Sequence, residues 1–147
     1  MNSKQLNILL ADDDQDDRYF FDIALKEIPI STNLTTVADG EQLMDYLSEN
    51  IENLPDVLFL DINMPRKSGN ECLSEIKHNK KLKDIPVAMF STNNSGDTVS
   101  LLLKGGAQVY IHKPSNFMHL SEVIKHALRI TSEKIFSKGQ VKYILNA

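Results

Sequence analysis

The stretch LNILLADDD, from Leu6 to Asp14, joins a continuous apolar run directly to a group of acids. Its first part hardly alternates between apolar and polar residues, which is typical of a strand that is buried on both faces of a parallel sheet. Four further short runs along the chain also read as strands: Leu34 to Ala38, Val57 to Leu60, Pro86 to Phe90 and Gln108 to His112. The sequence therefore predicts five strands.

Amphipathic stretches separate these runs and predict five helices. Apolar residues recur in them at helical spacing, and acids stand near the start of the first, where the helix dipole favours negative charge. The predicted helices are Asp16 to Glu27, Glu41 to Ser48, Glu71 to His78, Thr98 to Lys104 and Phe117 to Ile130. Strict alternation predicts an α/β fold, a doubly wound, five-stranded parallel sheet with five flanking helices.

Length and composition indicate one ordinary folded domain. We place it at residues 1–131 and expect residues 132–147 to be a short C-terminal tail, too small for an output domain. A net charge of −4 argues against nucleic-acid binding. No apolar run approaches the roughly 20 residues that span a bilayer. The single cysteine, Cys72, cannot form a disulfide within the chain, so we expect a cytoplasmic protein.

Acids, a hydroxyl and a lysine follow the ends of four predicted strands. In chain order these residues are Asp12 and Asp13, then Asp61, then Ser91, and finally Lys113. In an open parallel sheet, such strand ends share one edge, and binding sites form there at the point where the strand order reverses. A single acid in this position often does no more than cap a helix. Several converging acids indicate a site.

Converging carboxylates repel each other and favour a divalent cation. Oxygen ligands at this density suit Mg²⁺ or Mn²⁺. Lys113 and Ser91 at the same edge supply the positive charge and the hydrogen bond that an aspartyl phosphate requires. A metal, a nucleophilic carboxylate and a lysine together indicate phosphoryl transfer.

In order and spacing, these motifs resemble those of the receiver (CheY-like) domain of response regulators. The resemblance runs from about Asn7 to Ile130. It implies a flavodoxin-like strand order. It also implies that Asp61, which opens the segment DINMP at residues 61–65, is the phosphoacceptor.

The same resemblance assigns roles to the other residues at this edge. Asp13 would bind the metal directly and Asp12 would act through water. Ser91 would bond a phosphoryl oxygen, Tyr110 would be the switch aromatic, and the Lys113–Pro114 peptide would be cis. The metal site would comprise Asp12, Asp13, Asp61 and the backbone carbonyl of Asn63.

The function that this resemblance implies is that of a single-domain response regulator in a two-component phosphorelay. A sensor histidine kinase or a histidine phosphotransfer domain would phosphorylate Asp61 with Mg²⁺ bound, and the changed surface would bind a downstream protein. The chain would be a signalling module that reacts on itself and not an enzyme. Two alternatives remain open. A haloacid-dehalogenase phosphatase would need Asp where Asn63 stands, and a binding module independent of phosphorylation is disfavoured by the intact site.

Two segments lead to predictions about the surface. Three consecutive leucines sweep about 200° of a helix, so at least one of Leu101 and Leu103 should be poorly covered. Val99 and Leu103 match positions beside Tyr110, which in the family turns inward as Ser91 moves toward the phosphoryl group. We therefore expect an apolar patch there that responds to phosphorylation.

The second segment is the apolar, strand-like end of the tail, from Val141 to Leu145. It is interpreted either as a frayed or locally packed terminus or as a contact that forms a homodimer.

Overall fold

Strands and helices alternate along the chain in a computed structural model that describes residues 5–93, 95–114, 116–132 and 143–146. The strands are β1 (Leu6–Ala11), β2 (Thr32–Val37), β3 (Val57–Leu60), β4 (Val87–Ser91), β5 (Val109–His112) and β6 (Tyr143–Asn146). The helices are α1 (Gln15–Lys26), α2 (Gly40–Glu49), α3 (Gly69–Lys77), α4 (Gly96–Lys104) and α5 (Leu120–Ser132), and a 3₁₀ turn, η1 (Phe117–His119), precedes α5.

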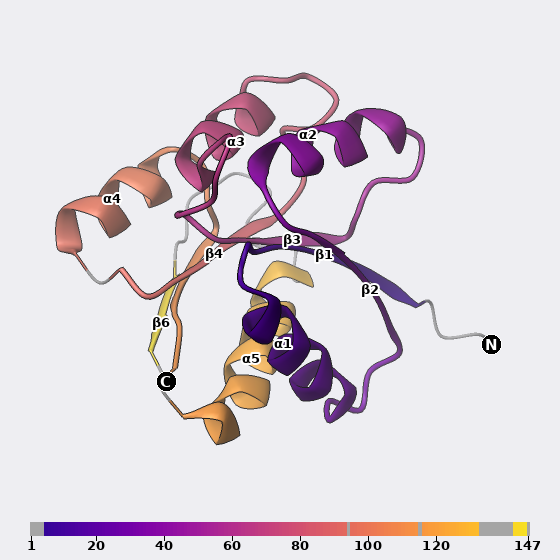
Figure 1. Cartoon of the computed structure of the whole chain (residues 1–147), viewed down its shortest axis with the longest axis vertical. Helices are drawn as coiled ribbons and strands as arrows, with labels where there is room; N and C mark the ends of the chain where they lie inside the picture. Colours follow the sequence, from indigo (N-terminus) through magenta and orange to yellow (C-terminus); the bar gives the residue numbers. More distant parts are fainter. Residues whose placement is uncertain (1–4, 94, 115, 133–142, 147) are drawn as a thin grey trace.

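One parallel sheet contains all six strands in the order β2-β1-β3-β4-β5-β6 (Figure 1). The chain moves outward from β1 to β2 and then crosses back to β3, so the strand order reverses between β1 and β3. The doubly wound α/β prediction is confirmed, and its five strands form the first five positions of the sheet. The sixth strand comes from the tail.

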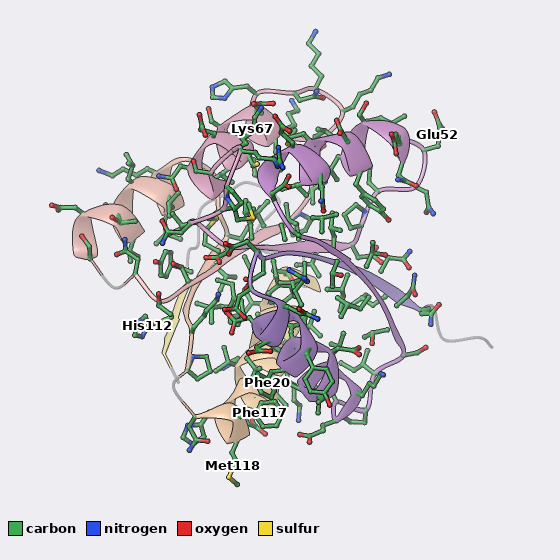
Figure 2. All side chains as sticks on the ribbon, viewed as in Figure 1. Phe20, Glu52, Lys67, His112, Phe117 and Met118 are labelled. Atoms are coloured by element: carbon green, nitrogen blue, oxygen red, sulfur yellow. The ribbon has the colours of Figure 1, made fainter. Side chains whose placement is uncertain are left out.

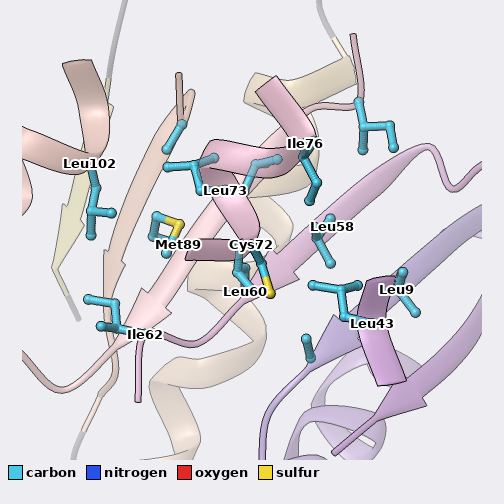
Figure 3. Close-up of a cluster of buried hydrophobic side chains, with 14 of the residues drawn as sticks. Leu9, Leu43, Leu58, Leu60, Ile62, Cys72, Leu73, Ile76, Met89 and Leu102 are labelled. Atoms are coloured by element: carbon cyan, nitrogen blue, oxygen red, sulfur yellow. The ribbon is translucent and has the colours of Figure 1, made fainter. Parts of the chain in front are cut away.

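Helices cover both faces of the sheet. α1 and α5 lie on one side, where Phe20 and Phe117 are found, and α2, α3 and α4 lie on the other (Figures 1 and 2). Successive strand residues point to opposite faces: Leu10 packs in the cluster under α1 and α5, and Leu9 packs in the cluster under the other three helices (Figure 3). Cys72 lies fully buried in that second cluster, with its Sγ 3.6 Å from a backbone carbonyl.

Capping residues fix where four helices begin. The side chains of Asp14, Asp39, Ser68 and Ser95 each accept a hydrogen bond from a backbone N–H in the first turn of the following helix. These helices therefore start one or two residues before the positions that apolar periodicity predicts. Among the described residues, no helix is long and apolar enough to cross a bilayer.

The tail adds a strand at the free edge of β5. Tyr143 to Asn146 pair in parallel with Val109 to His112 of the same chain. This pairing agrees with the locally packed interpretation of the tail, although residues 141 and 142 of the predicted segment lie outside the described residues. The homodimer stays a prediction.

The leucines of α4 have unequal surroundings. Leu101 is 64% exposed, whereas Leu102 is buried and Leu103 is partly buried against the core. The prediction of a poorly covered leucine is therefore confirmed at Leu101. Val99 is buried in the same cluster as Tyr110, and Leu103 packs partly against that cluster, so the patch that responds to phosphorylation beside these two residues stays a prediction.

Candidate functional site

Four strand ends bring the predicted site residues to one edge of the sheet. β1 and β3 are neighbours, and the backbone N–H of Asp61 donates to the carbonyl of Ala11 at 3.0 Å. β4 and β5 are neighbours as well, and the N–H of Lys113 donates to the carbonyl of Ser91 at 2.8 Å. The parallel register thus holds Asp12, Asp61, Ser91 and Lys113 together although they are far apart in sequence.

Asp61 is a buried carboxylate, with 7% of its surface exposed. Its pKa is raised to about 6, because burial, helped by the negative charge of Asp12, raises it more than the ammonium group of Lys113 lowers it. At neutral pH the group is still ionised, so it is a carboxylate with little hydration to lose.

Lys113 joins three carboxylates. Its Nζ lies 2.9 Å from Oδ2 of Asp12, 2.9 Å from Oδ2 of Asp17 and 3.3 Å from Oδ2 of Asp61. Burial works to lower the pKa of Lys113, but the hydrogen bonds to Asp12 and Asp17 outweigh it and raise that pKa above its ordinary value. The ammonium group therefore remains charged throughout the physiological range and faces Asp61.

Asp17 is the residue of this cluster that the sequence did not predict, because acids in the first turn of a helix are usually explained by the helix dipole. No spacing in the sequence distinguishes Asp17 from Asp16, because both stand in the first turn of α1.

Asp12, Asp13 and Asp61 can fit a divalent metal ion. One carboxylate oxygen from each lies within 4.8 Å of the others. Asp12 is fully buried, and its oxygens already accept from the backbone N–H of Asp14 and from Lys113. Asp13 is exposed. Hard carboxylate oxygens in this arrangement match the ligand preference of Mg²⁺ and Mn²⁺.

Ser91 and Tyr110 are both linked to Asn93, in the segment that leads from β4 to α4. Ser91 is fully buried, and its Oγ accepts from the N–H of Asn93 at 3.2 Å. The hydroxyl of Tyr110 donates to the carbonyl of Asn93. Tyr110 is 1% exposed and burial raises its pKa. The ring of Tyr110 thus lies inside the domain, where this hydrogen bond and the apolar cluster hold it.

The predicted cis peptide at Lys113–Pro114 is not found. No cis peptide bond occurs among the described residues, so this bond is trans, the isomer that Xaa–Pro bonds prefer by about 0.5–1 kcal/mol when no contact selects the other. Asn63 stands two residues after Asp61 and is exposed. Its role as a metal ligand stays a prediction.

The start of α3 packs directly against the backbone of Asp61. A Cβ on Gly69 would lie 2.0 Å from the carbonyl oxygen of Asp61, so only glycine fits this approach. The N–H of Gly69 donates to the carbonyl of Ile62 at 2.8 Å. Helix α3 therefore closes the loop that follows the carboxylate and fixes its position.

A cavity of about 240 Å³ opens beside the cluster, between α1 and η1, with Asp17 and Lys113 in its wall. Aromatic side chains continue from it to the surface: the rings of Phe20 and Phe117 have centroids 5.4 Å apart, and the tilted ring of Tyr19 contacts Phe20 at a centroid distance of 5.6 Å. Figure 2 shows Phe20, Phe117 and Met118 at this end of the molecule. We call Tyr19, Phe20, Phe117 and Met118, which are all exposed, the aromatic surface.

Comparison with known proteins matches the chain to one protein family. The family model of the response regulator receiver domain matches residues 8–125. The response regulator Rcp1 of Synechocystis sp. is 33% identical over 122 residues, which cover 80% of this chain and 83% of Rcp1.

Two solved structures have the same fold. The Mn²⁺-bound form of Rcp1 superposes with a TM-score of 0.73 at 29% identity, covering 93% of this chain and 97% of that one. The phosphorylated cyanobacterial phytochrome response regulator RcpA superposes with a TM-score of 0.74 at 30% identity, covering 90% and 94%.

Proposed function

Because the chain belongs to the response regulator receiver domain family of two-component signalling, we propose that Asp61 is the carboxylate that accepts and later loses a phosphoryl group. The observation that carries this proposal is the position of Asp61. It is buried at the end of β3, with the ammonium group of Lys113 at 3.3 Å and the carboxylates of Asp12 and Asp13 beside it.

In the proposed reaction, an Oδ atom of Asp61 attacks the phosphorus of a phosphohistidine. A P–O bond forms, the P–N bond breaks, and the imidazole nitrogen keeps the electron pair and takes up a proton. Lys113 offsets the charge that collects on the phosphoryl oxygens. The hydroxyl of Ser91 donates to one of these oxygens, which the bond that its Oγ accepts from the N–H of Asn93 does not prevent. Water later hydrolyses the acyl phosphate, so the chain carries out phosphoaspartate chemistry on itself.

The residues that would hold Mg²⁺, with Mn²⁺ as a substitute, are Asp12, Asp13, Asp61 and, through its carbonyl, Asn63. Both oxygens of Asp12 already have partners, which supports a role through water, whereas Asp13 is free to approach solvent. When bound, the cation supplies positive charge that Lys113 alone cannot provide for a phosphoryl group. The relative Rcp1 has been solved with Mn²⁺.

The proposed phosphodonor is a sensor histidine kinase or a histidine phosphotransfer domain in the cytoplasm. The aromatic surface supports its docking there, because the cavity beneath that surface shares Asp17 and Lys113 with the site. A downstream protein would read the phosphorylated state. The net charge of −4 supports a function that does not involve nucleic acid. We also propose no membrane as a partner. Within this proposal residues 1–131 act as the receiver, residues 132–147 as its tail, and a homodimer through the tail stays a prediction.

A labelling experiment tests the nucleophile. Wild-type protein in Mg²⁺ should be labelled by acetyl phosphate, and Asp61→Asn should lose the label, because an amide cannot form an acyl phosphate. Asp45→Asn removes an exposed carboxylate on α2, a helix on the other side of the sheet from α1, and should be labelled like wild type. Labelling of Asp61→Asn at the wild-type level, read by mass spectrometry, would contradict the assignment.

The comparisons give no support to the phosphatase alternative. Turnover of p-nitrophenyl phosphate by wild-type protein, lost in Asp61→Asn, would be needed to revive it.

A further inference from the structure

Lys113 has one more carboxylate partner than the proposed reaction uses. Asp12 belongs to the metal site and Asp61 is the nucleophile, but Asp17 has neither role. It nevertheless approaches Nζ of Lys113 to 2.9 Å, the same distance as Asp12 and closer than Asp61. An ammonium group has three N–H donors, so these three carboxylates occupy all of them.

A phosphoryl group on Asp61 would need one of these donors. Of the three carboxylate partners, Asp12 and Asp61 have side chains that are 0% and 10% exposed, whereas the side chain of Asp17 is 39% exposed. Releasing a buried carboxylate leaves an unpaired charge away from water, which is costly. Asp17 can instead be solvated, and its place in the first turn of α1 is favourable with or without Lys113. Its bond to Lys113 is therefore the one that can open.

We propose that Asp17 is a positioning residue that holds Lys113 in the unphosphorylated chain and gives up that hydrogen bond to a phosphoryl oxygen. The inference rests on the proposed function of Asp61. In this arrangement Asp17 favours the unphosphorylated state, because it competes with the phosphoryl group for the same donor and adds negative charge beside it.

Asp17 and Asp16 make a matched pair for the test. Both are acids in the first turn of α1, so replacing either by Asn removes one charge from the same end of the helix. Among the described residues, the carboxylates that contact Lys113 are Asp12, Asp17 and Asp61. Any difference between D17N and D16N therefore reports the contact with Lys113 and not the charge of the helix end.

The experiment measures the affinity of full-length protein for beryllium trifluoride, a phosphoryl mimic, in Mg²⁺ by fluorine NMR or calorimetry, together with stability in urea. D17N should bind the mimic about threefold more tightly than wild type, the size expected when a partly exposed ion pair no longer competes. D17N should also be less stable without the mimic, and D17E should return both values toward wild type. A residue with a merely structural role would lower stability without tightening binding.

The outcomes distinguish a failure of the role inferred for Asp17 from a failure of the function proposed for Asp61. If D17N tightens binding no more than D16N does, or weakens it, the role of Asp17 is refuted while the role of Asp61 stands. If wild-type protein itself binds no beryllium trifluoride in Mg²⁺, the proposed function fails, and the inference about Asp17 fails with it.

Discussion

The carboxyl group of Asp61 sits where ionisation is costly. It is buried, its neighbour Asp12 is also an acid, and the compensating charge of Lys113 is shared with two further carboxylates. The same features favour the proposed phosphoryl transfer, because a weakly hydrated carboxylate loses little hydration when it attacks phosphorus. A buried carboxylate at the end of β3 therefore has a cost in stability that can be measured.

The pH dependence of folding should show this cost. The pKa of Asp61 is raised by burial from 3.8 to about 6, so between these values the folded state binds more protons than the unfolded state. The contribution of Asp61 to the free energy of unfolding therefore falls as pH rises from about 4 to about 6. In EDTA at pH 7, Asp61→Asn should thus be more stable than wild type by an amount of the order of 3 kcal/mol, and at pH 4 the difference should nearly vanish.

Urea unfolding from pH 4 to pH 8 measures this difference. Lys113 keeps Asp12 and Asp17 as partners in the variant, so the cluster is not left with an unpaired cation. Asp45→Asn should follow the wild-type curve. An Asp61→Asn curve parallel to wild type across this range would show that Asp61 ionises normally in the folded chain.

Among the elements, β6 has the clearest consequence for assembly. It covers β5, whose residues Val109 to Ile111 are buried. Without β6, the backbone N–H and carbonyl groups along that edge of β5 would be unpaired, and such an edge invites pairing with another chain. We expect truncation after Ser132 to lower the unfolding free energy and to promote association, measured by urea unfolding and by light scattering.

A full-length control separates strand pairing from chain length. Adjacent strand residues direct their N–H groups to opposite sides, so replacing both Ile144 and Leu145 by Pro removes one donor toward β5 wherever the register lies. This double variant should behave like the truncation. If both proteins keep wild-type stability and oligomeric state, β6 contributes neither stability nor protection of the edge.

The predicted and observed elements agree best where burial is complete. β1 and β3 have the predicted bounds because both are buried apolar runs. β2 begins at Thr32 and not at Leu34, since it is the other edge of the sheet and most of its residues are polar. The tail could be recognised as strand-like, but its partner could not be predicted, because pairing with β5 depends on which edge is free in three dimensions.

For the molecule as a whole, the convergence of the site could be predicted because parallel strands bring their carboxyl ends together. That rule places Asp12, Asp61 and Lys113 at one edge without knowledge of any distance. It does not predict side-chain conformations. The bond from Asp17 to Lys113 and the buried position of Tyr110 depend on packing between α1, β5 and the segment after β4, which the order of residues along the chain does not specify.

A metal bound at this edge should stabilise the whole fold, because the proposed ligands Asp12, Asp13 and Asp61 directly follow strands β1 and β3, which are neighbours inside the sheet. Mg²⁺ that binds only the folded state stabilises it by about 2.7 kcal/mol at one hundred times the dissociation constant. Asp13→Ala should lose this gain. Without metal it should be at least as stable as wild type, since one repelling charge is gone.

Thermal unfolding with and without Mg²⁺ gives the measurement. Asp45→Ala, an exposed position on α2, serves as the control and should keep the full increment. Equal increments in Asp13→Ala and wild type would place the metal elsewhere.

Cys72 makes the chain convenient for site-specific chemistry. It is the single cysteine of the sequence, it lies on the buried face of α3, and burial raises its pKa to about 12. Thiol reagents attack the thiolate, so the native protein should be almost inert toward maleimides at neutral pH. A cysteine placed at exposed Leu101 or Met118 would then carry a fluorophore alone, and α4 or the aromatic surface could be followed in real time during phosphorylation without first removing the natural thiol.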